Sequence, residues 1–132
     1  MSEGNKEPTF YERVGGADGT RKLVDRFYEL MDTLPEATAI RGMHAASLHV
    51  SREKLFLFLS GWLGGPPLYI EKFGHPRLRA RHMPFAIDDA ARDAWMLCMM
   101  RALDDVVSDE DARTKLKGGF QGLADHMRNQ PG

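Results

Sequence analysis

The stretch that decides how this chain folds and works is Leu78–Ile87, with the sequence LRARHMPFAI. Its single histidine, His82, follows a short run that is compatible with a helix and that carries Arg77, Arg79 and Arg81. Pro84 comes two residues later, and a proline disfavours helical geometry in the residue before it. The sequence therefore predicts that His82 ends a short helix, beside a loop that holds the imidazole in place. A histidine alone is more often structural or solvated than a ligand, so its surroundings must decide its role.

Length and composition bound the class of protein. The 132 residues are enough for one domain with a real core or one enclosed cofactor. Hydrophobic residues make up 42% of the chain, charged residues 28%, and the net charge is −1, without the basic excess that nucleic acid favours. No apolar run reaches the roughly 18 residues of a membrane helix, and Met1–Thr9 lacks the apolar core of a secretion signal. We therefore expect a cytoplasmic protein with neither a membrane nor a nucleic-acid partner.

Apolar residues recur at helical spacing along most of the chain. The spacing predicts a short helix over Phe10–Val14, stopped by a glycine pair, and longer helices over Thr20–Asp32, Ser51–Leu63 and Asp88–Val107. A last helix starts in Ser108–Asp111. The faces predicted to be buried are Leu23, Val24, Phe27, Leu30 and Met31; Leu55, Phe58, Leu59 and Trp62; Ala91, Trp95, Cys98, Ala102 and Val106; and Leu116, Phe120, Leu123 and Met127. The sequence thus predicts an all-α domain over residues 10–128, with a flexible N-terminal tail (1–9) and a C-terminal tail (129–132).

The ends of these helices are less uniform in their signals. Ser51–Leu63 contains LFLFL, which alone is typical of a buried strand, but its length, the Ser51 cap and the glycine pair after it favour a helix. Asp18 and Asp88 are the predicted caps of the helices near them. Leu34–Val50 and Gly64–Pro76 carry prolines and glycines and are predicted to be irregular.

An ordered set of short motifs surrounds His82: Phe27-Tyr28, then LGGPPLY at 63–69, GHP at 74–76, and DAW at 93–95. From about Phe10 to Arg128, the chain resembles the group II truncated haemoglobins. The resemblance implies a two-over-two helical sandwich around one haem, with His82 as the proximal ligand of the iron. It also implies that Tyr28 donates a hydrogen bond to the distal ligand and that Trp95 lies on the distal side. The alternative for Tyr28 is a core residue whose hydroxyl is satisfied at an edge.

The distal loop is the part of the chain where the resemblance is weakest. Aligning backward from the LGG motif places His44 at the start of that loop, where family members carry Phe, Tyr or His. There its imidazole either holds the hydroxyl of Tyr28 or binds the iron when no ligand is present. The alternative for His44 and His49 is that both are exposed loop histidines.

A haem site needs an axial donor, an apolar slot, partners for two propionates and a controlled distal face. The slot candidates are Leu55, Phe58, Phe73, Phe85 and Ile87. Arg81 is the predicted propionate partner because it adjoins the ligand, and by family position Ser51, Lys54 and Tyr69 join it. The alternative for Arg77, Arg79 and Arg81 is a solvated basic face. The only cysteine, Cys98, excludes both a disulfide and a C-x-x-C-H attachment site, so the haem is expected to be a non-covalent haem b.

Two donors aimed at one bound ligand predict slow release. Tyr28 and Trp95 both donate hydrogen bonds, and O2 held in this way suits ligand chemistry with NO or peroxide, or sensing, better than transport. CO is a further expected ligand, and turnover needs an electron-donating reductase. The sequence leaves open a dioxygenase-like or a peroxidase-like activity, the oligomeric state and the reductase. A second hypothesis is a haem-free interaction module that uses its eight methionines to bind a partner helix.

Overall fold

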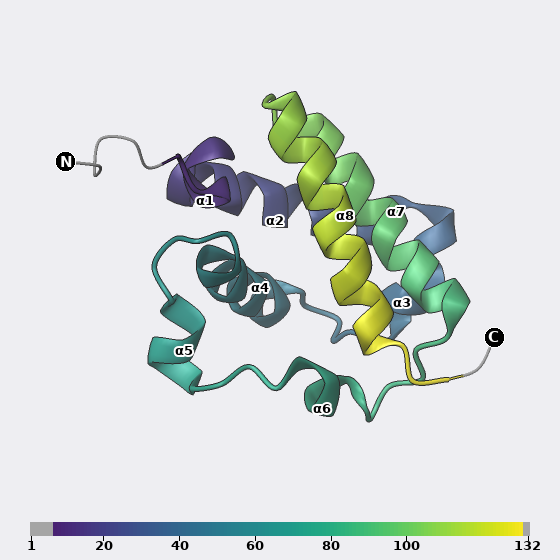
Figure 1. Cartoon of the computed structure of the whole chain (residues 1–132). Helices are drawn as coiled ribbons and strands as arrows, with labels where there is room; N and C mark the ends of the chain where they lie inside the picture. Colours follow the sequence, from purple (N-terminus) through teal and green to yellow (C-terminus); the bar gives the residue numbers. More distant parts are fainter. Residues whose placement is uncertain (1–6, 131–132) are drawn as a thin grey trace.

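The computed structural model describes residues 7–130, in which the chain forms a series of helices (Figure 1). In chain order they are α1 (Phe10–Arg13), α2 (Gly16–Thr33), the 3-10 turn η2 (Pro35–Ala37), α3 (Thr38–Gly42), α4 (His49–Trp62), α5 (Leu68–Phe73), α6 (Leu78–His82), α7 (Asp89–Val106) and α8 (Glu110–Met127). Residues 7–130 contain no strand, which confirms the all-α prediction. None of the helices in this range is long and apolar enough to cross a membrane.

Four long helices form two layers of two. α2 packs on α4, α7 packs on α8, and the layers meet where α2 packs on α7. Figure 1 shows α7 and α8 side by side, with α2 and α4 forming the other layer. The two-over-two sandwich is thus confirmed. The shorter helices α5 and α6 continue from α4 along one edge of the molecule, and α6 packs on α8.

The core lies at the crossing of α2 and α7. All five residues predicted for the inner face of α2 are buried, and so is Tyr28 beside them. Phe120 of α8 is completely buried, with its ring centroid 4.6 Å from that of Trp62 on α4 and 6.0 Å from that of Trp95 on α7. This aromatic group joins the two layers, because each of its three rings comes from a different helix.

Aspartates start the two C-terminal helices. As predicted, Asp88 caps α7 by accepting a hydrogen bond from the backbone N–H of Ala91 at 2.9 Å. Asp109 caps α8 in the same way through Ala112 at 3.0 Å, and its carboxylate also pairs with Arg13 of α1 at 2.8 Å. The Arg13 guanidinium, with the N–H of Ala112, lowers the pKa of Asp109 to about 2. The start of α8 is thereby fixed to the N-terminal end of the fold.

Two predicted caps are wrong. α2 begins at Gly16, before the predicted Thr20, because Gly15 takes a φ of +109° and turns the chain directly into the helix. Asp18 therefore lies inside the first turn and caps nothing. Likewise α4 begins at His49 after Leu48, so Ser51 lies within the helix.

The two segments predicted to be irregular contain short helices. η2 and α3 lie within 34–50, and α5 lies within 64–76. The prolines that favour irregular structure stand at the beginnings of these helices: Pro35 opens η2, and Pro67 directly precedes α5. A proline is tolerated there because the first N–H groups of a helix have no intrahelical partner.

The close approach of α2 to the end of α1 gives a test of the fold. A Cβ at Gly19 would lie 1.8 Å from the carbonyl oxygen of Val14, whereas a Cβ at Gly118 of α8 would meet nothing within 4 Å. We expect Gly19→Ala to lower the free energy of unfolding by about 2 kcal/mol or more, since backbone must move. The control Gly118→Ala should raise it by up to about 1 kcal/mol through helix propensity. Thermal unfolding followed by circular dichroism measures both, and equal effects would contradict this packing.

Candidate functional site

His82 is the last residue of α6, as the sequence predicts. The helix is followed by a turn in which the N–H of Phe85 donates to the carbonyl oxygen of His82 at 3.0 Å. His82 Nδ1 lies 2.6 Å from the carbonyl oxygen of Leu78, one turn earlier. A carbonyl oxygen only accepts, so Nδ1 carries the hydrogen, and the lone pair of the neutral ring is on Nε2. The half-buried imidazole therefore has one nitrogen bonded and oriented, and the other available to a metal.

Large apolar side chains near α6 are left exposed. Phe73 at the end of α5 is 42% exposed, and Met83 and Phe85 just after α6 are 55% and 42% exposed. The remaining predicted slot residues, Leu55, Phe58 and Ile87, are half-buried. Apolar side chains that gather on one part of a surface mark a place where an apolar group binds. α4, α5 and the α6 segment, which carry these residues, follow one another along one side of the molecule (Figure 1).

The ring of Phe27 contacts both predicted distal donors. Its ring centroid is 4.9 Å from that of Tyr28 and 5.1 Å from that of Trp95. Burial raises the pKa of Tyr28, while the charge of Arg52 and the side chain of Ser51 oppose that shift. The hydroxyl of Tyr28 is therefore protonated at neutral pH and able to donate, as the indole N–H of Trp95 always is. Both predicted donors thus pack against one buried ring.

His44 lies beside Tyr28. The two rings meet edge to face with their centroids 6.0 Å apart, and His44 Nδ1 lies 2.8 Å from the carbonyl oxygen of Ile40. This bond occupies Nδ1 and leaves Nε2 free. His49, by contrast, is exposed at the start of α4. Of the two histidines in this region, His44 is the one that contacts a predicted distal donor, Tyr28.

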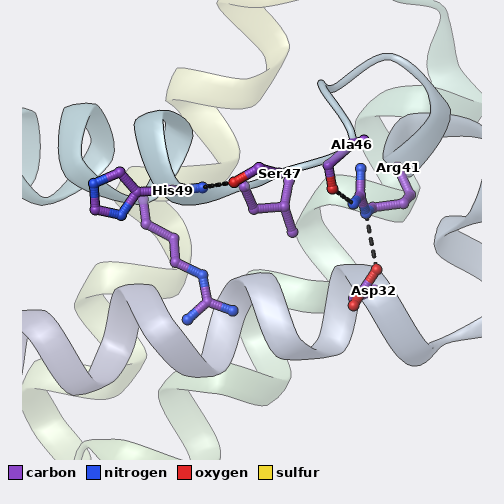
Figure 2. A pocket seen from close by; sticks show the side chains of 7 residues that line it. Asp32, Arg41, Ala46, Ser47 and His49 are labelled. Atoms are coloured by element: carbon purple, nitrogen blue, oxygen red, sulfur yellow. Dashed lines mark hydrogen bonds and ion pairs between the residues drawn. The ribbon is translucent and has the colours of Figure 1, made fainter.

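Arg41 holds the loop that follows His44 (Figure 2). Its guanidinium pairs with Asp32 of α2 at 2.9 Å and donates to the carbonyl oxygens of Ala45 at 2.9 Å and Ala46 at 2.7 Å. These groups border an open cavity of about 370 Å³, lined by Asp32, Arg41, Ala46, Ser47, Leu48, His49 and Arg52. The loop is therefore tied to α2 on the side that carries Tyr28.

The residues predicted to bind the haem propionates lie in different parts of the structure. Tyr69 is buried, with its ring centroid 6.5 Å from that of Phe58 and 5.0 Å from that of Phe73. Lys54 Nζ lies 5.7 Å from the centroid of the same Phe73 ring. Ser51 belongs to the surroundings of Tyr28, and Arg81 donates from Nε to the carbonyl oxygen of Pro76 at 2.8 Å. Lys54 and Tyr69 thus share the aromatic group around Phe73, while Arg81 stands on α6.

Comparison with known proteins identifies the family. The bacterial-like globin family matches residues 9–129. The group II 2-on-2 haemoglobin from the plant pathogen Agrobacterium tumefaciens is 47% identical, with a TM-score of 0.92 over 98% of this chain and 99% of that chain. The chain belongs to the group II truncated haemoglobins. A cold-adapted truncated haemoglobin from Pseudoalteromonas haloplanktis is 48% identical (TM-score 0.91, 93% of this chain and 99% of that chain). A truncated oxygen-avid haemoglobin from Bacillus subtilis is 39% identical (TM-score 0.84, 92% and 100%).

The residues of this truncated haemoglobin fit the haem that its family implies. A haem needs one free imidazole nitrogen and apolar surface for both faces of the macrocycle. His82 Nε2 would supply the first, and the exposed or half-buried apolar side chains of α4, α5 and the α6 segment would supply the second. The fit therefore rests on the donor and on apolar surface that the protein itself leaves uncovered.

The structure contradicts one of the other hypotheses drawn from the sequence. A methionine-rich docking face is wrong, because Met31, Met96, Met99 and Met127 are buried and, among the described methionines, only Met83 is exposed. The alternative of a solvated basic face agrees with the exposure of Arg77, Arg79 and Arg81, and Arg79 in addition donates from Nη1 to the carbonyl oxygens of His126 at 2.8 Å and Arg128 at 3.0 Å.

One residue that contacts the site was missed by the sequence analysis. Asn129, placed in the C-terminal tail, donates from Nδ2 to the carbonyl oxygen of His82 itself at 3.2 Å. No local pattern points to such a contact, because the two residues are 47 positions apart. The asparagine just after the last helix was the only signal, and asparagines are common at helix ends for purely local reasons.

Proposed function

We propose that His82 coordinates one b-type haem through Nε2 and that the protein reversibly binds O2 and other diatomic ligands on the opposite face. The observation that carries this proposal is the His82 ring, which is bonded at Nδ1, free at Nε2 and set among exposed apolar side chains. When bound, haem supplies an iron that takes O2, CO or NO. Leu55, Phe58, Phe73, Phe85 and Ile87 cover the macrocycle and exclude water from it. The bound haem thereby buries the side chains of Phe73 and Phe85, which are exposed without it.

The attachment is non-covalent in this proposal. Cys98 is the only cysteine of the chain and is completely buried in the core, where burial also raises the pKa of its thiol to about 11. A neutral, buried thiol is unreactive and out of reach of a cofactor on the surface of the core. The cytoplasm, which keeps such a thiol reduced, is the proposed location.

The propionates of the haem need cations or hydroxyls at the rim. Lys54 and Tyr69, which share the aromatic group around Phe73, are suited to one propionate. Arg81 uses only Nε on Pro76 and keeps its terminal nitrogens for the other. Ser51 is the remaining candidate, and its position near Tyr28 links the rim to the distal side.

On the distal side, the proposed donors are Tyr28 and Trp95. Two hydrogen bonds of about 1–1.5 kcal/mol each slow ligand escape by roughly one to two orders of magnitude. Slow release suits a protein in which the bound ligand reacts with NO or peroxide, or a protein that senses the ligand. Repeated reaction of the bound ligand needs an electron-donating reductase. The oxygen-avid character of the Bacillus subtilis relative supports this assignment.

His44 is proposed to orient the Tyr28 hydroxyl and not to bind the iron. Binding the iron would require the loop after His44 to swing inward. That movement breaks the His44–Ile40 bond and the three bonds of Arg41 to Asp32, Ala45 and Ala46. Several hydrogen bonds are lost for one coordination bond, so the geometry favours the orienting role.

The assignment of the proximal ligand is tested by His82→Ala. We expect it to abolish stoichiometric haem binding and to remove the increase in melting temperature that haem gives the folded state. Visible absorption spectra of the ferric protein, and of the ferrous protein with CO, measure the binding. The control His126→Ala should bind haem normally, because that side chain is exposed on the last turn of α8. A His82→Ala protein with an unchanged spectrum would show that the ligand is another residue.

The distal donors are tested by their phenylalanine variants. Tyr28→Phe and Trp95→Phe should each speed O2 release by about five- to tenfold, the factor for one lost hydrogen bond. The double variant should be non-additive because both donors serve one ligand. Stopped-flow measurement of O2 release decides the matter, with Tyr11→Phe on α1 as the control. Unchanged rates in both single variants would show that the two side chains only pack in the core and donate no hydrogen bond to the ligand.

The role of His44 is tested by the ferric spectrum and by O2 release. Near neutral pH, we expect the wild-type ferric iron to be five-coordinate or to hold water, and His44→Phe to release O2 faster. A low-spin bis-histidine spectrum in the wild type that disappears in His44→Phe would establish coordination by His44 instead. O2 release at the same rate in both proteins would remove His44 from the distal site.

A further inference from the structure

The residue just beyond the last helix is bonded to the segment that carries His82. Asn129 Nδ2 donates to the carbonyl oxygens of His82 at 3.2 Å and Phe85 at 2.9 Å, and its Oδ1 accepts from the N–H of Ile87 at 2.9 Å. Its own N–H donates to the carbonyl oxygen of Ile87 at 2.8 Å. Both ends of one amide side chain are therefore used on a segment 42 to 47 residues earlier in the chain.

The contact is reciprocal. Arg79, inside α6, donates from Nη1 to the carbonyl oxygens of His126 and Arg128, which the end of α8 leaves without helical partners. Arg128 in turn pairs with Asp89 at the start of α7 at 2.5 Å. The end of α8 is thereby fixed to both flanks of the His82 segment, and Figure 1 shows the end of α8 reaching the chain between α6 and α7.

Apolar packing does not hold this segment. No residue of α6 is buried, and α8 is the helix on which α6 packs. A helix of five residues is not stable alone, because nucleation is costly and few bonds form. The hydrogen bonds from the end of α8 are then the main restraint on where α6 lies, and His82 is its last residue.

We propose that Asn129 is a positioning residue for the proximal histidine: it fixes the carbonyl end of α6 and so sets the place and tilt of the His82 imidazole. Asn129 acts through the backbone of His82, Phe85 and Ile87. The iron–imidazole geometry and haem retention depend on this residue. The inference rests on the proposed function, since it concerns the residue proposed to bind the iron.

The test uses two variants and one matched control in the full chain. Asn129→Asp keeps the size of the side chain and the acceptor for Ile87, but places a carboxylate oxygen against the carbonyl oxygens of His82 and Phe85. Asn129→Ala removes the side-chain bonds altogether. Gln130→Ala is the control, because Gln130 contributes its backbone N–H to Ile87 and no side-chain bond. Circular dichroism verifies that all three proteins fold.

The first readout does not need haem. Trypsin cuts after Arg79 and Arg81, which lie inside α6, only when this helix opens locally, and mass spectrometry identifies the fragments. We expect both Asn129 variants to be cut there about tenfold faster than the wild type, the factor for one or two lost hydrogen bonds, and Gln130→Ala to match the wild type. Unchanged cutting in both variants overturns the proposal.

The second readout follows the haem-loaded protein. Transfer of haem to excess apomyoglobin should be about tenfold faster in both Asn129 variants, and the iron–histidine stretching band in the ferrous resonance Raman spectrum should shift. A merely structural role would speed cutting and leave that band unchanged, and this result also overturns the proposal. If the wild type takes up no haem, the proposed function fails, while the trypsin arm still decides whether Asn129 fixes α6.

Discussion

Phe27 is completely buried where α2 crosses α7, and its ring contacts those of both Tyr28 and Trp95. Tyr28 comes from α2 and Trp95 from α7, so these two contacts hold the proposed donors of both helices against the same ring. Protein interiors are close-packed, so these rings move only if the helices move. On the proposed function, the distal side is therefore held by the packing of the core, and the donors need no reorganisation when a ligand binds. Phe120 adds to this packing by joining Trp95 to Trp62.

The proximal side is built on a different principle. α6 has no buried residue, and its position depends on hydrogen bonds to backbone carbonyls and amides. The Leu78 carbonyl orients the His82 ring, while Arg79 and Asn129 connect the helix to the end of α8. Each such bond contributes little net stability but has strict geometry. Apolar packing thus positions the proposed distal donors, and directional polar bonds position the proposed proximal ligand.

The difference between the two sides explains how much the sequence predicts. Apolar spacing identifies the buried face of α2 and most of that of α8, because the pattern is local and repeats every turn. On α7 the predicted face is only partly right: Cys98 and Ala102 are buried, but the spacing missed the buried Met96, Met99 and Leu103. Pro84 marks the end of α6 for a similarly local reason. The caps at Asp18 and Ser51 fail because Gly15 and Leu48 start their helices earlier, and a favourable capping residue cannot act once it lies within the helix.

What the sequence could not show is contact between distant residues. α5 was not predicted because prolines come directly before it. A proline can either start a helix or interrupt one, and the sequence alone does not show which applies. Only the family resemblance predicted that His44 lies near Tyr28. No feature of the sequence predicted the hydrogen bond between His44 and the carbonyl oxygen of Ile40. The hydrogen bonds of Asn129 join positions that are 42 to 47 residues apart in the chain. Hydrophobic periodicity and helix-capping rules concern neighbouring residues and predict no contact at that separation.

The exposed apolar residues show how the two sides form one site. Phe73, Met83 and Phe85 all lie between the end of α5 and the start of α7, whereas the core formed by α2, α7 and α8 is closed without them. The described helices thus form one complete core and one open apolar surface beside α6. On the proposed function, haem closes that surface and adds a coordination bond to the segment that packing leaves least restrained. The free energy of haem binding then stabilises the His82 segment most. The proposed distal donors are already held in place by Phe27, so haem binding changes their positions little.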